Sequence, residues 1–586
     1  MTRLHATEPS VAVGMFRPRT PERPWRVRPR SRTADRRRGT GGRDTTADST
    51  WMPFDPLYHP FPSRRMTVYA RMGMVATSQP LAAQAGLAIL RRGGNAVDAA
   101  VAAAAALTVV EPTSNGIGGD AFAIVWHQGR MYGLNASGPA PAGITLGAVA
   151  RSGASEMPAF GWTPVTVPGA PAAWAALAQR FGRLPLGESL APAVEYAENG
   201  YPLSPVLARN WAGAFQSYQR RLTGALFQPW FHTFAPLGRA PGIGELWRSP
   251  GHADTLRSIG ASQARAFYEG DLADRIDAFS RAHGGYLRKS DLESFRVQWV
   301  DPVSVRYRGY DIWELPPNGQ GIVALMALNI LSGFEFAEHG SAETLHLQLE
   351  AIKLAFADGK QFITDPAYMR IRVEDLLSPA YGEERRRLIA ATARTPEPGQ
   401  PRGGGTVYLA TADGEGTMVS FIQSNYMGFG SGVVVPGTGI SLQNRGHTFS
   451  LRADAANCLA PGKRTYHTII PGFLTRQGVP VGPFGVMGGY MQPQGHVQVV
   501  MNSLDFRLNP QAALDAPRWQ WIEGKRADVE RFPEDVVQAL LRKGHQLRIA
   551  TDAGGFGTGQ IIWRDAETGV LAGGTEPRTE GAIAAY

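Results

Sequence analysis

Thr406 stands between a run of three glycines and a short apolar segment, a position from which its hydroxyl group could act as a nucleophile. The glycines at 403–405 impose almost no restriction on φ and ψ, so the backbone can take strained or left-handed geometry before the threonine. Residues 407–412 form a compact apolar run ahead of an Asp-Gly turn signal, which predicts a buried strand. Two interpretations stand side by side: a plain loop-to-strand junction, or a nucleophile that the glycines leave uncovered.

The nucleophile interpretation requires Thr406 to become a new N-terminus. If the peptide bond between Gly405 and Thr406 is strained, the threonine hydroxyl can attack it, and cleavage then frees the α-amino group of Thr406. That amino group has an ordinary pKa of about 7.7–8.0 and becomes a base beside the hydroxyl that it must activate. The stretch alone does not choose between the two interpretations, so the rest of the chain decides.

Other catalytic and metal-binding patterns have little support. The twelve histidines show no His-Glu-x-x-His or comparable spacing, and the single cysteine, Cys458, excludes a cysteine metal cluster and an intramolecular disulfide. Residues 428–432 read Gly-Phe-Gly-Ser-Gly, which places the serine one position too late for a serine-hydrolase elbow. The glycine-punctuated loop at 112–120 has no Walker lysine after it, so a tight turn is favoured over a phosphate cradle. We therefore expect no metal and no cofactor.

The basic charge of the chain is concentrated at its N-terminus. Residues 1–51 hold twelve arginines against five acids and so carry +7 of the net charge of +9. Such a segment, without apolar periodicity, is predicted to be disordered. It is either an arm that could bind nucleic acid or a gene-model extension ahead of a native start at Met52, and we favour the extension and expect no nucleic-acid partner.

No segment predicts export or membrane insertion. The N-terminus lacks the 7–15-residue apolar region of a Sec signal peptide, and no window reaches the roughly 18 apolar residues of a transmembrane helix. A cytoplasmic protein with no membrane partner is the expectation, in agreement with the lone cysteine.

Hydrophobic patterning predicts an α+β chain. Strands are expected as a hairpin at 121–126 and 131–135 and, beyond Thr406, at 418–423, 469–474 and 484–487. An alanine-rich core helix is expected at 96–110, and residues 170–400 are mainly helical in pattern, with helices at 172–180, 191–199, 261–280, 322–331 and 342–358.

Many short motifs, taken in order, resemble the γ-glutamyltranspeptidase family of N-terminal-nucleophile (Ntn) hydrolases. They lie at residues 93–100, 110–112, 116–119, 167–169, 267–270, 285, 291–292, 316–317, 429–432, 438–440, 461–464, 488–489, 516–518 and 577–578. Each is weak alone, but the ordered set covers nearly all of the chain after the basic segment. The resemblance implies a four-layer αββα sandwich formed by a large subunit (52–405) and a small subunit (406–586) of one precursor.

The resemblance also implies catalytic roles. The precursor would cut itself between Gly405 and Thr406, and Thr406 would then attack a substrate carbonyl to form an acyl-enzyme. Gly488 and Gly489 match the pair whose N–H groups form the oxyanion hole. Ser424 falls where the family has a threonine hydroxyl that hydrogen-bonds the nucleophile.

The sequence departs from the family at the positions that hold a glutamyl head group. Ser137 replaces the arginine that binds the α-carboxylate, and His467 and Thr468 replace a pair of serines. Asn444 and Arg445 lie in the stretch that normally holds the α-amino group, where Arg445 replaces Glu or Gln and a nearby aspartate becomes threonine. Losing anions near a new cation disfavours an ammonium ligand. Arg445 therefore either binds a substrate carboxylate or forms a structural salt bridge.

These departures resemble a divergent branch of the family that includes glutaryl acylases and an oxamate amidohydrolase. Three hypotheses follow. The first is an amidohydrolase or acyltransferase for γ-glutamyl or similar small amides, as in glutathione hydrolysis. The second changes the substrate to a carboxylate-bearing amide without an α-amino group. The third is an inactive homologue or a nucleic-acid binder that uses the basic arm. The first two predict a large/small heterodimer, which could itself pair as a dimer of heterodimers.

Overall fold

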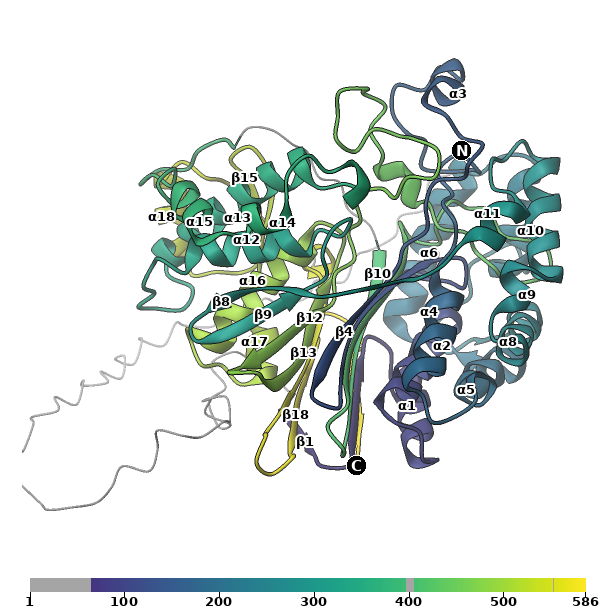
Figure 1. Ribbon diagram of the computed structural model, residues 1–586, viewed down its shortest axis with the longest axis horizontal. Helices are drawn as coiled ribbons and strands as arrows, with labels where there is room; N and C mark the ends of the chain where they lie inside the picture. Colours follow the sequence, from purple (N-terminus) through teal and green to yellow (C-terminus); the bar gives the residue numbers. More distant parts are fainter. Residues whose placement is uncertain (1–64, 397–404, 552) are drawn as a thin grey trace, which may run out of the picture. The chain divides into compact units, whose positions relative to one another are not determined.

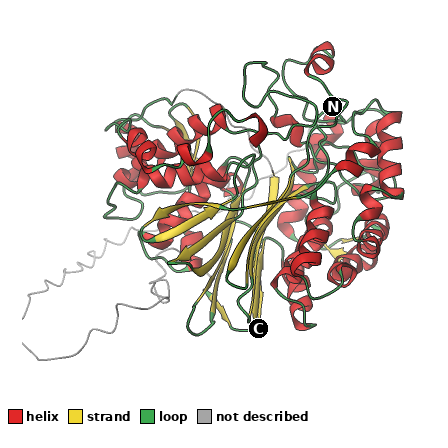
Figure 2. Ribbon diagram, viewed as in Figure 1, coloured by secondary structure: helices red, strands yellow, loops and turns green. Residues whose placement is uncertain are grey.

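The computed structural model describes residues 65–396, 405–551 and 553–586. The predictions for the basic segment 1–51, the start at Met52 and the glycines Gly403 and Gly404 lie outside these residues. Two large antiparallel sheets and their covering helices make up most of what is described (Figure 2). Among the described helices, none has both the length and the apolar character needed to cross a membrane.

Thr406 lies in the first of the two sheets, here called the Thr406 sheet. Its strands, in spatial order, are β19 (Ala582–Ala585), β2 (Gly73–Thr77), β10 (Gly405–Asp413), β11 (Met418–Tyr426), β3 (Asp120–His127), β4 (Arg130–Ala136) and β7 (Gln298–Val300). The opposing sheet contains β1 (Val68–Ala70), β18 (Leu571–Thr575), β17 (Thr558–Arg564), β13 (Val479–Met487), β12 (Gly472–Arg476), β9 (Tyr310–Glu314) and β8 (Val303–Tyr307). The predicted strand at 407–412 and the predicted hairpin are confirmed by β10, β3 and β4.

Alternate side chains of β10 enter two different cores, because successive residues of a strand face opposite sides of its sheet. Tyr408, Ala410 and Ala412 belong to the apolar core between the two sheets. Val407 and Leu409 belong to the core beneath the helices. A strand that is buried on both faces has no polar face, which explains why the apolar run after Thr406 is continuous.

Helices cover the outer side of each sheet, which gives four layers (Figure 1). The core outside the Thr406 sheet includes α1 (Pro80–Arg91), α2 (Ala96–Val110), α4 (Ala170–Phe181), α5 (Leu186–Asn199) and α8 (Pro250–Ser262). The core outside the opposing sheet includes α12 (Gly321–Leu331), α13 (Ala342–Phe362), α16 (Met491–Leu504) and α17 (Pro510–Asp515). The predicted α+β sandwich with αββα layers is confirmed.

The predicted alanine-rich helix is α2, and every one of its residues is buried. Asn95 and Asp98 form a capping box at its N-terminus, which satisfies backbone N–H groups that the helix itself leaves unpaired. Small side chains let α2 pack tightly against its neighbours. The alanine-rich sequence is therefore explained by burial within the protein.

The remaining elements surround these layers. They are α3 (Leu146–Arg151), β5 (Tyr201–Pro202), α6 (Pro205–Arg221), η1 (Ala225–Phe227), α7 (Gln228–Phe234), β6 (Leu246–Trp247), α9 (Arg265–Tyr268), α10 (Asp271–Ala282), α11 (Lys289–Ser294), η2 (Pro366–Tyr368), α14 (Val373–Leu376), α15 (Pro379–Arg386), η3 (Arg445–Thr448), β14 (Trp519–Glu523), β15 (Arg526–Val529), α18 (Glu534–Arg542), β16 (Gln546–Ile549) and η4 (Ala553–Phe556).

Three predictions differ from the structure. The single helix expected at 261–280 is wrong, because α8, α9 and α10 share this stretch. Gln263 and Ala264 separate the first two with φ of 52° and 64°, a left-handed conformation that a right-handed helix cannot include. The strand expected at 469–474 begins only at Gly472, and β7, β8 and β9 interrupt the region that was expected to be mainly helical.

Gly485 of β13 allows the two sheets to approach, because a Cβ atom there would lie 2.5 Å from the Tyr408 ring of β10. We expect Gly485→Ala to lower the free energy of unfolding by about 1–3 kcal/mol, the usual cost of overpacking a core. Thermal denaturation measures this change. The matched control is Gly213→Ala in α6, where a Cβ atom meets nothing within 4 Å and alanine favours the helix. Equal midpoints for Gly485→Ala and wild type would contradict the close packing.

Candidate active site

Thr406 lies at a β-bulge near the start of β10, one of the central strands of its sheet. In the ladder between β10 and β11, Gly405 is opposite Tyr426 and Val407 is opposite Gln423, so two residues of β11 face Thr406 alone. Bulges bend a strand and redirect a side chain, and they are common beside active sites. Thr406 is itself buried, with 1% of its surface exposed.

Ser424 is the hydroxyl nearest to Thr406 in this bulge. Its Oγ lies 3.1 Å from Thr406 Oγ1 and accepts a 2.7 Å hydrogen bond from the backbone N–H of Tyr426. Tyr426 has φ of 75°, which is rare for a bulky residue, and this conformation turns the chain sharply at the end of β11. The structure thus brings Ser424 and Thr406 together as the sequence predicts.

The glycine loop at 116–119 packs backbone to backbone against the end of β11. A hydrogen bond of 3.0 Å from the N–H of Gly119 to the carbonyl of Gly116 closes the turn, which confirms the predicted tight turn. A Cβ atom on Gly119 would lie 2.6 Å from the carbonyl oxygen of Ser424, so only glycine fits this contact. The loop therefore supports the strand end that carries Ser424.

Asp120, which follows this loop, is an important residue that the sequence analysis missed. It lies opposite Ser424 in the β3–β11 ladder and is fully buried. Its carboxylate accepts hydrogen bonds from Gln443 Nε2 at 2.7 Å, Arg445 Nε at 3.1 Å and His467 Nε2 at 2.8 Å. Burial alone would raise the pKa of Asp120, but His467 and Arg445 outweigh it and hold that pKa below its usual value. Asp120 is thus the anion around which the cluster is built.

Arg445 is buried and only partly satisfied by its neighbours. Its Nε donates to Asp120, its Nη1 donates to Thr468 Oγ1 at 2.7 Å, and its guanidinium lies 4.6 Å from the centre of the Tyr426 ring. Its Nη2 is buried without a hydrogen-bond partner among the described residues. The structural salt bridge, one of the two interpretations of Arg445, is therefore present, and the Nη2 group of the same side chain remains available.

His467 has a defined tautomer. Its Nδ1 accepts the backbone N–H of Ile469 at 3.3 Å, so its proton is on Nε2 and is donated to Asp120. Burial, together with the charge of Arg445, lowers the pKa of His467 to about 4. The imidazole is therefore neutral near pH 7, which leaves Arg445 as the cation that contacts Asp120 among the described residues.

The glycine pair is joined to this cluster through Gln320. Gln320 Nε2 donates to the carbonyl oxygens of Thr468 at 2.7 Å and Gly489 at 2.9 Å. Gly488 and Gly489 lie between β13 and α16 with φ of 137° and 60°, conformations that favour glycine. Neither backbone N–H has an acceptor among the described residues. Both N–H groups thus lie beyond the end of β13 and just before the N-terminus of α16.

Ser137 and Asn444 are held by protein contacts. Ser137 Oγ donates to Asn135 at 2.7 Å and accepts from Asn318 Nδ2 at 3.2 Å. Asn444 Oδ1 accepts the N–H of Met427 at 3.1 Å, and its amide nitrogen donates to a backbone carbonyl. Both residues shape the site, and their direct contact with substrate remains a prediction.

The sandwich and the hydroxyl at the start of a central strand define the class of protein, an Ntn hydrolase. Comparison with known proteins gives the family. The family model described as gamma-glutamyltranspeptidase matches residues 82–586, and the chain belongs to this family.

Several relatives are similar over almost their whole length. The glutathione hydrolase-like YwrD proenzyme of Bacillus subtilis is 38% identical over 520 residues, which cover 87% of this chain and 97% of the relative. The oxamate amidohydrolase proenzyme of Klebsiella pneumoniae is 36% identical over 532 residues, which cover 88% of this chain and 98% of the relative. The crystal structure of cephalosporin acylase from Bacillus halodurans is 63% identical in sequence and matches with a TM-score of 0.88. The match covers 91% of this chain and 99% of the acylase chain. The chain is therefore a hydrolase of this family.

The neutral state of His467 predicts a pH dependence of stability. The unfolded chain binds a proton on this residue near pH 6.5, whereas the folded protein does so only near pH 4. Wild type should therefore lose stability as the pH falls from about 6.5 to 4, by up to about 1.4 kcal/mol per pH unit from this group. Thermal midpoints across this range should fall less steeply for His467→Gln. Parallel curves would show that His467 is protonated in the folded protein.

Proposed function

We propose that the protein is an autoprocessing amidohydrolase with an N-terminal threonine nucleophile. Its precursor is cut between Gly405 and Thr406, which gives a large subunit ending at 405 and a small subunit of residues 406–586. The observation that supports this best is the bulge that presents Thr406 Oγ1 to Ser424 at 3.1 Å. The names of the relatives, which are proenzymes, agree with a processed chain.

The geometry suggests a role for each group in the reaction. Thr406 Oγ attacks the substrate carbonyl, and the freed α-amino group takes up the hydroxyl proton, since its ordinary pKa lies near neutrality. The carbonyl oxygen becomes an anion that the N–H groups of Gly488 and Gly489 stabilise, helped by the partial positive charge at the start of α16. The amine leaves with a proton, and water or an acceptor amine then releases the acyl group from Thr406.

Replacement of the hydroxyl tests self-cleavage. We expect wild type to give two chains that separate before Thr406, whereas Thr406→Ala stays whole because no nucleophile remains. Intact-mass spectrometry of the purified proteins measures this. Thr406→Ser is the matched control, since it keeps a hydroxyl and should still be cut. A wild-type chain that stays whole would contradict the proposal and favour the inactive-homologue hypothesis.

The cluster around Asp120 indicates the substrate class. An α-ammonium group would need a free anion, but the Asp120 carboxylate already accepts three hydrogen bonds and is paired with Arg445. Among the described side chains that contact Asp120, the donor group without a partner is cationic, Arg445 Nη2. A charged donor that is buried and unpaired is costly, and a substrate carboxylate would satisfy it.

We therefore propose an acyl group that carries a carboxylate and has no α-amino group, such as an oxamate or glutaryl amide. The relative named oxamate amidohydrolase supports this choice over a glutathione-type γ-glutamyl substrate, because oxamate is a carboxylate-bearing amide without an α-amino group. The γ-glutamyl hypothesis remains the alternative, supported by the relative named glutathione hydrolase-like.

Three p-nitroanilides with five-carbon acyl chains separate these substrates. Glutaryl carries the terminal carboxylate, γ-glutamyl adds an α-amino group, and valeryl has a methyl group in place of the carboxylate. A charge-assisted hydrogen bond is worth about 1.5–3 kcal/mol, so kcat/KM should be roughly 10- to 150-fold higher for glutaryl than for valeryl. A higher value for γ-glutamyl than for glutaryl would contradict the proposal.

Removal of the charge pair is the matching change in the protein. Arg445→Met alone would leave Asp120 as an unpaired buried charge and destabilise the fold, so it is combined with Asp120→Asn. The double variant should lose most of the preference for glutaryl over valeryl, chiefly through a higher KM, and should still be cut before Thr406. A preference that persists would assign carboxylate binding to other residues.

The assembly has two levels in this proposal. The large and small subunits form a heterodimer because β10 and β11 of the small subunit lie between β2 and β3 of the large subunit. A dimer of heterodimers and the absence of a nucleic-acid partner remain predictions, and the segment 1–51 on which the second depends lies outside the described residues.

A further inference from the structure

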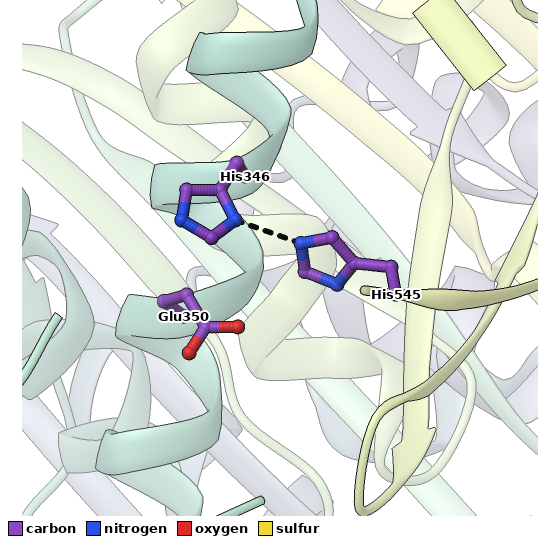
Figure 3. A group of neighbouring side chains, drawn as sticks. All are labelled: His346, Glu350 and His545. Carbon is purple, nitrogen blue, oxygen red and sulfur yellow. Dashed lines mark hydrogen bonds between the residues drawn. The ribbon is translucent and has the colours of Figure 1, made fainter. Parts of the chain in front are cut away.

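A second buried polar cluster joins α13 to His545, which follows α18, and shares no residue with the Asp120 cluster. His346, Glu350 and His545 offer nitrogen and oxygen atoms that all lie within 4.8 Å of one another, and all three side chains are buried (Figure 3). His346 and Glu350 share one face of α13 because they are four residues apart. Histidines and a carboxylate at this spacing are typical zinc ligands, so a metal is the first interpretation to test.

The contacts fit a hydrogen-bonded anchor better than a metal site. Lys353 Nζ lies 2.6 Å from Glu350 Oε1, so an ammonium group already pairs with the carboxylate and would repel a divalent cation. His346 Nδ1 and His545 Nε2 are 2.8 Å apart and share a hydrogen bond. Burial, with the charge of Lys353, lowers the pKa of His545 to about 3. The His545 imidazole is therefore uncharged near pH 7.

The cluster converges on the backbone of residues 390–394. His346 Nε2 donates to the carbonyl of Ala390 at 2.8 Å, and Lys353 Nζ donates to the carbonyl of Arg394 at 3.1 Å. Glu350 Oε2 accepts the N–H of Arg394 at 3.2 Å. Side chains of α13 therefore bind two backbone carbonyls and one backbone N–H group of this segment.

The same segment is also held from the other side. The N–H of Ala393 donates to the carbonyl of Lys543 at 2.7 Å, and the Ala393 side chain is buried. Lys543 Nζ in turn pairs with Glu343 of α13 at 2.7 Å. Residues 390–394 are thus held between α13, in the proposed large subunit, and Lys543, in the proposed small subunit.

The position of this segment in the chain gives these contacts a role. Arg394 precedes Gly405 by only eleven positions, and β10 is fixed at Gly405 by its ladder. The chain is therefore held at described residues on both sides of the proposed cleavage site, and precise positioning of reacting groups favours their reaction. We propose that His346, Glu350 and Lys353 are positioning residues for self-cleavage, which rests on the proposed function, because they anchor the segment that leads to the scissile bond.

The rate of self-cleavage tests this role in the full chain. Glu350→Met with Lys353→Met removes both contacts to Arg394 and leaves no unpaired charge, and His346→Phe removes the contact to Ala390 independently. Each should slow the disappearance of intact precursor roughly tenfold or more, since small displacements from the reactive geometry are costly. Gln348→Met is the matched control on α13: it loses a 2.9 Å hydrogen bond from Trp519 and touches no residue of the anchored segment, so its rate should match wild type.

Hydrogen exchange supplies a readout that does not depend on cleavage. In a Thr406→Ala background, the N–H groups of Ala393 and Arg394 should lose protection in the Met/Met variant and keep it with Gln348→Met. If wild type is cut and both anchor variants are cut at the same rate as wild type, the anchoring proposal is overturned and the proposed function stands. An uncut wild type would overturn both. Unchanged protection, or stoichiometric zinc in the purified protein by elemental analysis, would also contradict the anchor.

Discussion

The arrangement of the site depends on one buried carboxylate. Asp120 is at the start of β3, yet it accepts hydrogen bonds from Gln443, Arg445 and His467, which come from two segments beyond β11. A charge removed from water in this way is tolerated only when paired and fully hydrogen-bonded. Satisfying Asp120 therefore fixes where both segments lie, and with them the polar wall beside Thr406 and Ser424.

The two sheets convert this local constraint into a site with two sides. β10 and β11 carry Thr406 and Ser424, whereas β13 leads to Gly488 and Gly489 from the opposing sheet. Gln320 connects the two sides, because one amide nitrogen donates both to Thr468 and to Gly489. Close contact between the sheets, as at Gly485 against Tyr408, keeps the hydroxyl and the glycine pair on a common scaffold.

The sequence predicted what depends on local pattern. The strand after Thr406, the helix α2 and the layered α+β architecture could be predicted because apolar runs, caps and turns are encoded within a few residues. The break at Gln263 and Ala264 could not, since neither residue type signals a left-handed backbone. Asp120 was missed for another reason: its partners lie more than 300 positions away, and an aspartate after a glycine loop looks like an ordinary turn residue.

Arg445 shows why the two interpretations of a buried arginine need not exclude each other. A guanidinium group has five N–H donors in a rigid fork, so it can pair with Asp120 through Nε and still present Nη2 elsewhere. The salt bridge and the stack on Tyr426 restrict the rotamer, which lowers the entropy that a ligand would otherwise have to remove. A lysine could not do both, because its compact ammonium has no fixed second edge. The structural pair is thus the condition under which Arg445 can act as a selective donor.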